Sequence, residues 1–520
     1  MKNNALVLTF DVGTQSTRAL LVNKQGQIEA SCQSAYEEPY FSKRSGWAEQ
    51  KPDFYFERIC SVSREICEKH SDKLDRVIAV TITVIRDTVL CLDKENKPLR
   101  DIILWLDKRE AKNDEHYGAI KKCIFKLVKM EETVKNQTRT SACNWIMENE
   151  PEIWQKTAKY VMLPTYLNYK LTGRLCDSAA NMVGHVPFDY KNRRWMKKSD
   201  LTRTVANVSD DRLCELVPSG TVIGRISDEV CELMGLPTGL ELIATGSDKG
   251  CETLGLSVLG YDKAAVSFGT TATVQMTVKD YFEPQKFLPA YPAVPNDMYN
   301  PEFQVYRGYW MVSWFIKEFA AQEKQEAQEK GWSVERVLDS YLDTVPAGCD
   351  GLVLQPYWTA GISNPLAKGA MIGFSDIHTR HHFYRAIIEG IDLALLDGLK
   401  MMEKRSGKKV KEIFVGGGGS KSKAVCQILS NVMGLPVKCI QTHEACGIGS
   451  SMVAFISKGE FSGYDEAVKS MIQVSRVFEP DMKEHEIYAE IYSQVYSKMY
   501  GRLEPLYKKM KKYLKRSNKL

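Results

Sequence analysis

Short apolar runs alternate with polar segments along the chain, and several of them have the length of a single strand. The first run lies at residues 6–10 (LVLTF), and a second follows at 19–22 (ALLV). A longer continuous run at 77–84 (VIAVTITV) predicts a buried strand. Residues 55–70 and 383–404 instead repeat their apolar positions with helical spacing, so two amphipathic helices are expected there.

A turn rich in Gly, Ser and Thr joins the first two apolar runs. It reads DVGTQSTR and contains Asp11, Gly13, Thr14, Gln15 and Arg18. Backbone N–H groups and hydroxyls presented at close range can bind phosphate, and Arg18 adds a cation. An ordinary hairpin turn, in which Asp11 and Thr14 bond locally, explains the same residues.

The same design returns in the second half of the chain. Residues 263–274 (KAAVSFGTTATV) enter a Gly-Thr turn at Gly269 and Thr270 and leave it through another β-rich run. Two such hairpins suggest a duplicated fold in which each half carries one hairpin and a nucleotide cleft lies between the halves. The repetition argues against the ordinary-turn interpretation at both places.

Asp248 stands in a short loop, TGSDKG, between the apolar runs 240–244 and 253–259. Such a loop between apolar runs can hold a carboxylate that takes part in proton transfer. By itself, an acidic residue near a Gly-Thr turn is a weak signal.

Four consecutive glycines follow a predicted strand at 412–415 and precede a predicted helix at 424–433. Glycines at this position let a flat or anionic ligand approach the backbone and leave the helix N-terminus facing it, so Gly417, Gly418 and Ser422 are candidates for nucleotide contacts. The segment is not a Walker A loop, because a serine precedes its Lys-Ser pair. A flexible loop is the alternative interpretation.

Charged side chains follow two apolar runs in the first half. Arg86 and Asp87 come shortly after the apolar run at 77–84. Trp105 and Asp107 lie at the end of the next apolar run, residues 102–109 (IILWLDKR). Strand ends are the usual place for ligand-binding groups in an α/β sheet. The alternatives are a structural Arg86–Asp87 ion pair and simple core packing of Trp105.

Composition narrows the function further. A chain of 520 residues suggests roughly two to four domains. A net charge of +5 does not indicate a nucleic-acid partner, and 14 scattered Cys without a CxxC pair fit a reducing compartment. Asp11 interrupts the N-terminal apolar run, and no apolar run has the length of a membrane span. We therefore expect a cytoplasmic protein without nucleic-acid or membrane partners.

Taken in order, these segments resemble the FGGY family of carbohydrate kinases within the actin-like ATPase superfamily. The resemblance covers nearly the whole chain: FDVGTQSTRALLV, GWAEQKPDFYFE, ENEPEIW, YLNYKLTG, TGSDKGCETLG, SFGTTATV, a long segment beginning GLVLQPYWTAG, and VGGGGSKSKAVCQILSNVMGLPV. It implies an α/β protein with two ribonuclease-H-like domains, each with a five-stranded sheet, around a central cleft. The predicted limits are an N-terminal domain at 1–257, a C-terminal domain at 258–475 and a helical extension at 476–520.

The resemblance also implies roles for individual residues. Asp248 would accept the proton of the acceptor hydroxyl, and Asp11 and Asp248 would hold or orient Mg²⁺. ATP would be bound by residues of both hairpins and of the glycine-rich loop, namely Gly13, Thr14, Gln15, Arg18, Gly269, Thr270, Gly417, Gly418 and Ser422.

Substrate choice is less defined. The Arg86-Asp87 pair resembles the Arg-Glu pair of glycerol kinases, whereas the Trp-x-Asp-x-Arg pattern at Trp105 and Asp107 resembles xylulose-type members. The predicted acceptor is therefore a small-molecule ketose, such as xylulose or ribulose, or a polyol such as glycerol or a tetritol. A homodimer is compatible with the sequence.

Two other classes of function remain open at this level. One is an actin-like nucleotide-dependent switch, and the other is a sugar sensor without kinase activity. A pure switch has no need of a hydroxyl-binding pocket, and every expected site position holds a chemically competent residue, so the kinase is the favoured hypothesis.

Overall fold

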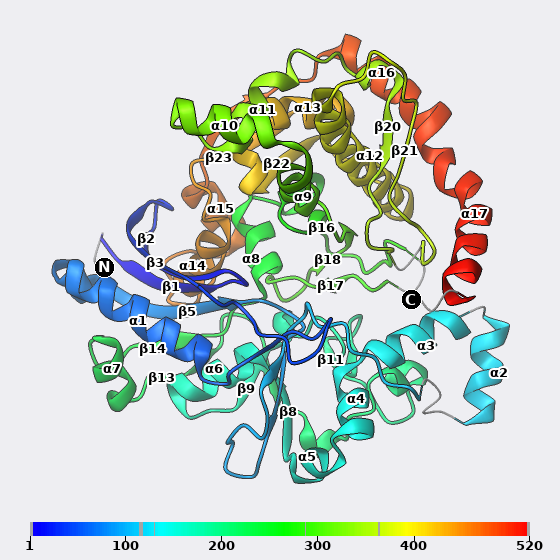
Figure 1. The fold of residues 1–520 in the computed structure, drawn as a ribbon. Helices are drawn as coiled ribbons and strands as arrows, with labels where there is room; N and C mark the ends of the chain where they lie inside the picture. Colours follow the sequence, from blue (N-terminus) through cyan, green and yellow to red (C-terminus); the bar gives the residue numbers. More distant parts are fainter. Residues whose placement is uncertain (1–3, 114–117, 129, 286–287, 362–363, 517–520) are drawn as a thin grey trace. The chain divides into compact units, whose positions relative to one another are not determined.

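The structure is a computed structural model that describes residues 4–113, 118–128, 130–285, 288–361 and 364–516. Its chain forms two compact units, each with its own sheet (Figure 1). Unit 1 consists of Met1–Gly255, Tyr291–Tyr299 and Glu444–Ile472, and unit 2 consists of Leu256–Ala290, Asn300–His443 and Gln473–Leu520. The prediction drew each domain as one continuous stretch, so the units differ from it at the two segments that join unit 1.

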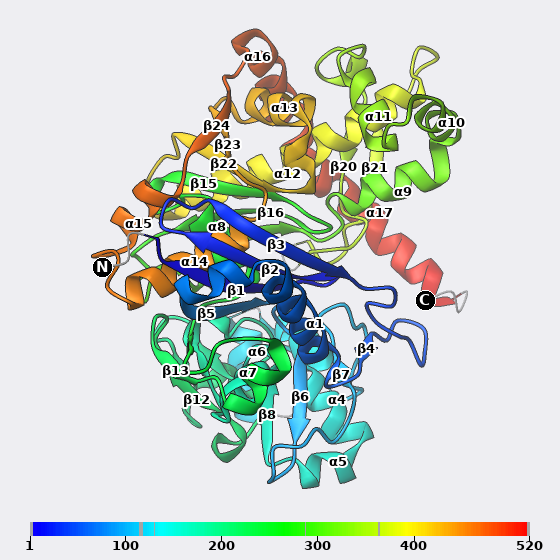
Figure 2. The ribbon, with the colours of Figure 1, turned by 90° about the vertical axis from the view of Figure 1, so that its left-hand side faces the viewer.

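Unit 1 is built on a six-stranded sheet with the order β13-β14-β5-β1-β2-β3. The β1–β2 and β2–β3 pairs are antiparallel, whereas β5 lies parallel to β1 and β14 lies parallel to β5. Figure 2 shows β1, β2 and β3 lying side by side. The strands are β1 Leu6–Val12, β2 Ser16–Asn23, β3 Ile28–Ala35, β5 Val77–Val84, β13 Val222–Arg225 and β14 Glu241–Ile243.

Both faces of this sheet are covered by helices, because successive side chains of a strand point to opposite faces. Leu8 and Phe10 belong to the same buried cluster as Ile59 of helix α1 (Phe54–Lys69). Thr9, which lies between them, instead hydrogen-bonds Ser451 of helix α14 (Ala445–Ser457) at 2.8 Å between hydroxyl oxygens. Two-sided burial explains why the predicted strand at 77–84 reads as a continuous apolar run.

Unit 2 repeats this topology. Its sheet has the order β19-β16-β15-β22-β23-β24, with the same sequence of antiparallel and parallel pairs. The predicted duplication is therefore present in the strand order, but each sheet has six strands rather than five, because a short antiparallel edge strand (β13 or β24) is added. The strands are β15 Gly260–Phe268, β16 Ala272–Thr277, β19 Glu302–Val305, β22 Glu412–Gly417, β23 Val437–Ile440 and β24 Val474–Phe478.

Smaller elements complete the two units (Figure 1). In unit 1 they are β4 Glu49–Gln50, β6 Val89–Leu92, β7 Ile102–Ile103, β8 Lys159–Met162, β9 Cys176–Ser178, β10 Phe188–Asp189, β11 Arg194–Trp195, β12 Glu215–Val217, β17 Tyr291–Pro292, α2 Ala119–Leu127, α3 Glu131–Thr140, α4 Ala142–Asn149, α5 Pro151–Lys156, α6 Leu163–Thr172, α7 Asp228–Met234, α8 Asp248–Gly255 and α15 Tyr464–Met471. In unit 2 they are α9 Trp310–Phe319, α10 Ala321–Lys330, α11 Val334–Leu342, β20 Val353–Gln355, β21 Ala370–Ile372, α12 Arg380–Ser406, α13 Lys423–Met433, α16 Met482–Ile491 and α17 Ser497–Arg516; β18 Tyr299–Asn300 lies where the chain returns to this unit.

The two long helices predicted from apolar spacing are confirmed as α1 and α12. The expectation that Asp248 lies in a loop is wrong, because Asp248 is the first residue of α8. The apolar run that begins IILWL is a strand only at Ile102–Ile103. In the part of the chain that the structure describes, no helix combines the length and apolar character needed to cross a bilayer. All fourteen cysteines are free.

Candidate active site

The first predicted phosphate-binding turn is the β1–β2 hairpin of unit 1. The backbone N–H of Gly13 donates to the carbonyl of Ser16 at 3.0 Å, which closes the turn. The strand register places Asp11 opposite Arg18, and the Arg18 Nη1 lies 3.4 Å from the Asp11 Oδ2. The hairpin therefore holds a carboxylate and a guanidinium side by side at the edge of a turn rich in backbone N–H groups.

Asp11 is buried among other carboxylates. Burial raises its pKa to about 7, the Arg18 guanidinium opposes this shift, and Glu444, Asp248 and Glu252 add to it. A carboxylate in such surroundings is stabilised in its charged form when another cation binds beside it.

Asp248 begins α8, and its carboxylate accepts the backbone N–H of Lys249 at 2.8 Å. Burial raises the pKa of this carboxyl group, whereas the charges of Arg86 and Lys249 lower it. Burial prevails, so the pKa is raised overall, which is a suitable property for a general base.

Lys249 is itself held by the helix that Asp248 begins. Its Nζ lies 2.6 Å from the Glu252 Oε2, one turn further along α8. The thiol of Cys446, at the start of α14, lies 3.5 Å from the carbonyl oxygen of Asp248. Two helices of unit 1 thus fix the position of the Asp248 backbone.

Arg86 follows β5 and stacks on an aromatic ring from a distant part of the sequence. Its guanidinium carbon lies 5.4 Å from the centroid of the Tyr291 ring, which the segment Tyr291–Tyr299 brings into unit 1. Because Arg86 lowers the pKa of Asp248, its charge acts at the predicted catalytic residue.

Asp87 has a partner that the sequence did not suggest. The imidazole Nδ1 of His185 lies 3.0 Å from the Asp87 Oδ2, and the backbone N–H of His185 donates to the Asp87 Oδ1 at 3.0 Å. Burial works to raise the pKa of Asp87, but His185 and the charge of Arg86 together outweigh it and the pKa is lowered. His185 and Asp87 thus form an ion pair that the sequence did not predict.

Trp105 contacts the first hairpin directly. Its indole N–H donates to the hydroxyl of Thr14 at 3.1 Å, and its side chain is only partly buried. The tryptophan therefore connects the candidate acceptor residues with the candidate phosphate-binding turn.

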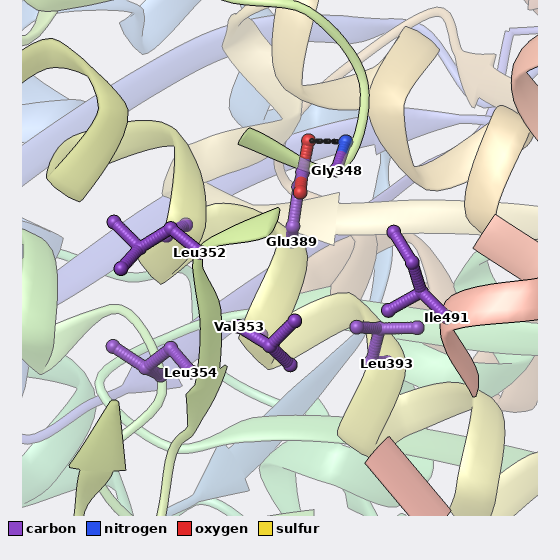
Figure 3. Close-up of a pocket in the computed structure, with 9 residues that line it drawn as sticks. Gly348, Leu352, Val353, Leu354, Glu389, Leu393 and Ile491 are labelled. Carbon is purple, nitrogen blue, oxygen red and sulfur yellow. Dashed lines mark hydrogen bonds between the residues drawn. The ribbon is translucent and has the colours of Figure 1, made fainter. Parts of the chain in front are cut away.

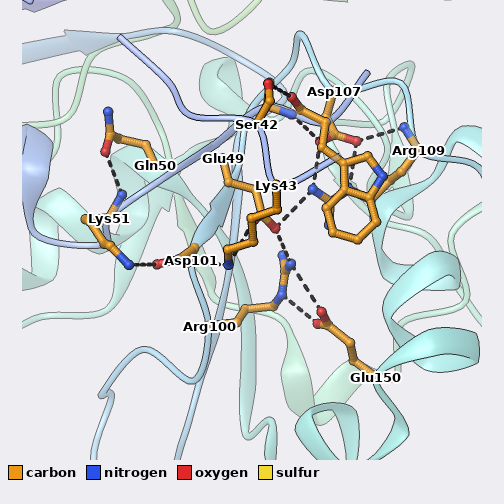
Figure 4. A network of polar contacts seen from close by, with 12 residues as sticks. Ser42, Lys43, Glu49, Gln50, Lys51, Arg100, Asp101, Asp107, Arg109 and Glu150 are labelled. Carbon is orange, nitrogen blue, oxygen red and sulfur yellow. Dashed lines mark hydrogen bonds and ion pairs between the residues drawn. The ribbon is translucent and has the colours of Figure 1, made fainter. Parts of the chain in front are cut away.

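Asp107 belongs to a buried polar network (Figure 4). Its two oxygens accept Arg109 at 2.7 and 2.8 Å, and they also accept the backbone N–H groups of Arg109 and Ala48. Glu49 joins Arg109 to Arg100 in the same network. Because a carboxylate offers about four lone-pair sites, these bonds leave Asp107 little capacity for a sugar hydroxyl.

The second hairpin lies in unit 2, between β15 and β16. The carbonyls of Gly269 and Thr270 accept the backbone N–H groups of Tyr309 and Trp310 at 3.1 and 3.4 Å. These bonds hold the turn against the start of α9, so its shape is fixed from outside the hairpin.

The glycine-rich loop follows β22, directly beside this hairpin, because β15 and β22 are parallel neighbours that pair Phe268 with Gly417. Gly417 has a φ of +77°, and a Cβ there would lie 2.8 Å from the backbone of Phe268. Gly418, by contrast, has open space around the position of a Cβ. Ser422 caps α13 by accepting the backbone N–H of Val425 at 3.2 Å.

Two hollows of unit 2 contain none of the predicted site residues. One is a narrow crevice between Leu354, Glu389 and Ile491 that leaves no room even for a water molecule (Figure 3). The other, of about 550 Å³, is lined mainly by polar side chains that include Arg385 and Glu484. The polar side chains collected in unit 1 are therefore the better candidate site.

Mg²⁺ prefers oxygen ligands, which the carboxylates of this region offer. Among the described residues, no three His, Cys, Asp or Glu side chains are grouped so that they could hold a metal ion. Mg²⁺ is usually held by only one or two carboxylates together with substrate phosphates and water, so a buried carboxylate with a raised pKa, such as Asp11, fits that mode of binding.

Sequence reasoning missed three residues of this region. Tyr291 and His185 are distant in sequence from the residues that they contact, so no local pattern pointed to them. Lys249 stood in the quoted loop, but only the helical start of α8 shows that it pairs with Glu252.

The repeated strand order and the two hairpins define an actin-like ATPase fold with a polar site in its first unit. Residues 6–255 match the N-terminal domain of the FGGY family of carbohydrate kinases, and residues 264–457 match its C-terminal domain. The chain belongs to this family, whose members are ATP-dependent phosphotransferases.

Individual relatives agree with this assignment. The chain is 25% identical to the xylulose kinase of Lactococcus lactis subsp. lactis (strain IL1403) over 474 residues, which cover 90% of each protein. In fold it is similar to a ligand-bound xylulose kinase of Lactobacillus acidophilus, with a TM-score of 0.82 and 21% identity over 97% of this chain and 100% of that one. A gluconate kinase of the same organism gives a TM-score of 0.82 with 21% identity over 98% and 100% of the two chains.

Proposed function

We propose that this carbohydrate kinase transfers the γ-phosphate of ATP to a hydroxyl of a small ketose, with Asp248 as the general base. The observation that carries the proposal is the setting of Asp248: a partly buried carboxylate at the start of α8, beside the charges of Arg86 and Lys249. A carboxylate whose pKa is raised by burial is a stronger base, so it can accept the proton that the acceptor hydroxyl loses as it attacks phosphorus.

Charge neutralisation is assigned to the two hairpins. The backbone N–H groups and Arg18 of the first turn, together with Gly269 and Thr270 of the second, would bind the phosphates of ATP, and the loop at Gly417, Gly418 and Ser422 would bind the adenosine. In phosphoryl transfer, positioning and electrostatic stabilisation provide most of the rate enhancement. Mg²⁺, held by Asp11 and near Asp248, would neutralise phosphate charge when bound.

The acceptor is assigned to Arg86, Asp87 and Trp105. Arg86 and Asp87 are charged groups that can bind neighbouring hydroxyls, and Trp105 already contacts the first hairpin through Thr14. Asp107 is assigned the supporting role of holding Arg109, because its oxygens are occupied. The favoured substrate class is a ketose such as xylulose or ribulose, since the L. lactis relative is a xylulose kinase.

A polyol is the second candidate, because an arginine followed by an acid at the end of β5 is the pattern that resembles glycerol kinases. The two candidates make different demands on the site: a ketose offers a carbonyl in addition to its hydroxyls, and a polyol offers hydroxyls alone.

An ADP-release assay across pentuloses, hexuloses, glycerol, tetritols, pentitols and aldonates tests the proposal. We expect one ketose to stimulate ADP release well above the sugar-free rate, with one phosphorylated sugar formed for each ADP. Stimulation by a polyol alone would replace the ketose assignment. The absence of stimulation by every compound would refute the proposed acceptor class.

A further inference from the structure

The end of β5 is held in an unusual backbone conformation. Asp87 has a φ of +51°, a left-handed value that is uncommon for residues other than glycine. Its backbone N–H donates to the carbonyl of Val183 at 3.2 Å, so the segment after β9 fixes it from outside the strand. Such a conformation persists only where its surroundings impose it.

The neighbouring Gly184 and His185 impose it from the same side. Gly184 has a φ of +132°, and a Cβ there would lie 2.2 Å from the Asp87 Oδ1, so only glycine allows the close approach. His185 then donates its backbone N–H to one oxygen of Asp87 and places its Nδ1 3.0 Å from the other. The carboxylate is thus held by both of its oxygens.

The neighbours of both ring nitrogens of His185 can accommodate an imidazolium. Its Nδ1 faces a carboxylate oxygen, which only accepts, so this nitrogen carries a hydrogen. Its Nε2 lies 3.2 Å from the hydroxyl of Thr140, at the end of α3. That hydroxyl has a single hydrogen, which it donates within α3 to the carbonyl of Asn136 at 3.0 Å or of Gln137 at 3.3 Å. Donated in this way, the hydrogen leaves the hydroxyl oxygen able to accept from Nε2–H, so an imidazolium can be hydrogen-bonded at both ring nitrogens.

We propose that His185 is held as an imidazolium that positions Asp87 at the acceptor end of β5, so that sugar binding depends on the charge of this histidine. The proposal rests on the function proposed above, in which Asp87 and its neighbour Arg86 bind the acceptor. His185 is a positioning residue: it acts on the sugar through Asp87.

A pH dependence follows from this arrangement. Burial acts to lower the pKa of His185, but Asp87 outweighs it and the pKa is raised, while that of Asp87 is lowered. The ion pair is therefore retained to higher pH than an ordinary histidine would allow, and it is lost as pH rises through the raised pKa of His185. Among the described residues, the other titratable or charged groups recorded near the pair are Arg86, Tyr160 and Tyr190, and the hydroxyl of Tyr190 bonds the backbone of Gly184.

The kinetic test compares His185→Gln with wild type on the sugar identified by the screen. Glutamine keeps a hydrogen-bond donor but has no charge. Because loss of the charge weakens the hydrogen bond that positions Asp87, we expect the KM for sugar to rise about tenfold (about 1.4 kcal/mol), with the KM for ATP and kcat within about twofold of wild type. The wild-type KM for sugar should rise at alkaline pH, and this rise should be absent from the variant. His70→Gln, at the end of α1, is the matched control and should behave as wild type.

A second variant tests the charge without touching the histidine. Thr140→Val removes the acceptor at Nε2, so the alkaline rise in KM should move to lower pH. A wild-type KM and pH profile in both His185→Gln and Thr140→Val would overturn the proposal.

Nitrogen chemical shifts of the His185 ring provide a readout that needs no kinase activity. We expect the ring to titrate above the range of ordinary histidines in wild type and at lower pH in Asp87→Asn. A His185 ring that is neutral at pH 7 in wild type would overturn the imidazolium even if sugar is phosphorylated. If no sugar is phosphorylated, the proposed function and the positioning role fail together, whereas a raised titration still supports the imidazolium.

Discussion

Asp248 combines burial with two neighbouring cations, and this combination determines what its removal should do. In Asp248→Asn the carboxamide can accept the Lys249 N–H as before but cannot take a proton from a hydroxyl. We expect sugar phosphorylation to fall by roughly 10²–10⁴-fold, the usual contribution of a positioned base. Nucleotide affinity should stay near the wild-type value, since the predicted ATP contacts come from other residues. Coupled ADP release and calorimetric titration with ATP measure the two quantities.

The matched control is Asp228→Asn, an exposed aspartate in the first turn of α7 of the same unit. It should leave both quantities unchanged. Near wild-type phosphorylation by Asp248→Asn would show that another group accepts the proton.

Lys249 should set the pH at which the base becomes active. Burial raises the pKa of Asp248 and Lys249 lowers it, while the carboxylate of Glu252 acts in the raising direction. In Lys249→Gln the positive charge that lowers the pKa of Asp248 is lost, and Glu252 loses its ion pair with Lys249. The pKa of Asp248 should therefore rise further. The acid limb of the kcat/KM profile should therefore move to higher pH than in wild type.

Profiles recorded from pH 5 to 9 test this sign, with Lys156→Gln, an exposed residue at the end of α5, as the control. An acid limb that stays in place or moves to lower pH in Lys249→Gln would mean that Asp248 does not control it.

At the scale of single residues, the sequence pointed to side chains whose contacts lie within a local pattern. Asp11 and Arg18 face each other across a two-stranded hairpin, so their pairing follows from the turn itself. His185 and Tyr291 reach Asp87 and Arg86 across about 100 to 200 residues of chain, which no periodicity or turn chemistry encodes. For the same reason the sequence suggested only Arg86 as an ion-pair partner of Asp87 and did not point to His185.

Among the elements, α8 is the one whose type was predicted wrongly. Its sequence, DKGCETLG, contains two glycines, which lower the helix propensity of so short a segment. The structure supplies the reason for one of them: a Cβ on Gly255 would lie 1.9 Å from the carbonyl oxygen of Ala445 in α14. A Cβ on Gly449 of α14 would in turn lie 2.0 Å from the carbonyl oxygen of Cys251. Tertiary packing between the two backbones thus outweighs local propensity.

This contact leads to a prediction about stability and activity together. Gly255→Ala and Gly449→Ala should each force α8 and α14 apart and lower the free energy of unfolding by about 1–3 kcal/mol, the usual cost of overpacking. Because α8 begins with Asp248, each should also reduce kcat by more than the loss of folded protein explains.

Thermal denaturation together with kcat per folded molecule separates the two effects. Gly463→Ala, also in unit 1, is the control, since nothing lies within 4 Å of the position of its Cβ. Wild-type stability of both α8 and α14 variants would show that the helices tolerate a wider separation.

For the whole molecule, the repetition of one hairpin design correctly predicted that the fold is duplicated. The two sheets share strand order and strand direction, which a single recurring motif could only suggest. The boundaries of the units were harder to predict, because Tyr291–Tyr299 and Glu444–Ile472 join unit 1 from late positions in the chain. Helix α14 makes two contacts that its local sequence does not predict. Its small residues allow close contact with α8, and the hydroxyl of Ser451 bonds Thr9 of β1.

Because each unit has its own buried core, unfolding of the chain should depart from two-state behaviour. Leu8 of β1 and Leu395 of α12 are both fully buried, one in each core, so Leu8→Ala and Leu395→Ala should each cost about 2–5 kcal/mol. Each variant should lower a different part of the calorimetric transition, and the calorimetric enthalpy of wild type should exceed its van't Hoff enthalpy. A single transition with equal enthalpies, shifted alike by both substitutions, would show instead that the two cores unfold as one. ATP should raise the part of the transition that Leu395→Ala lowers, since unit 2 carries the proposed adenosine loop and a ligand that binds only the folded state stabilises it.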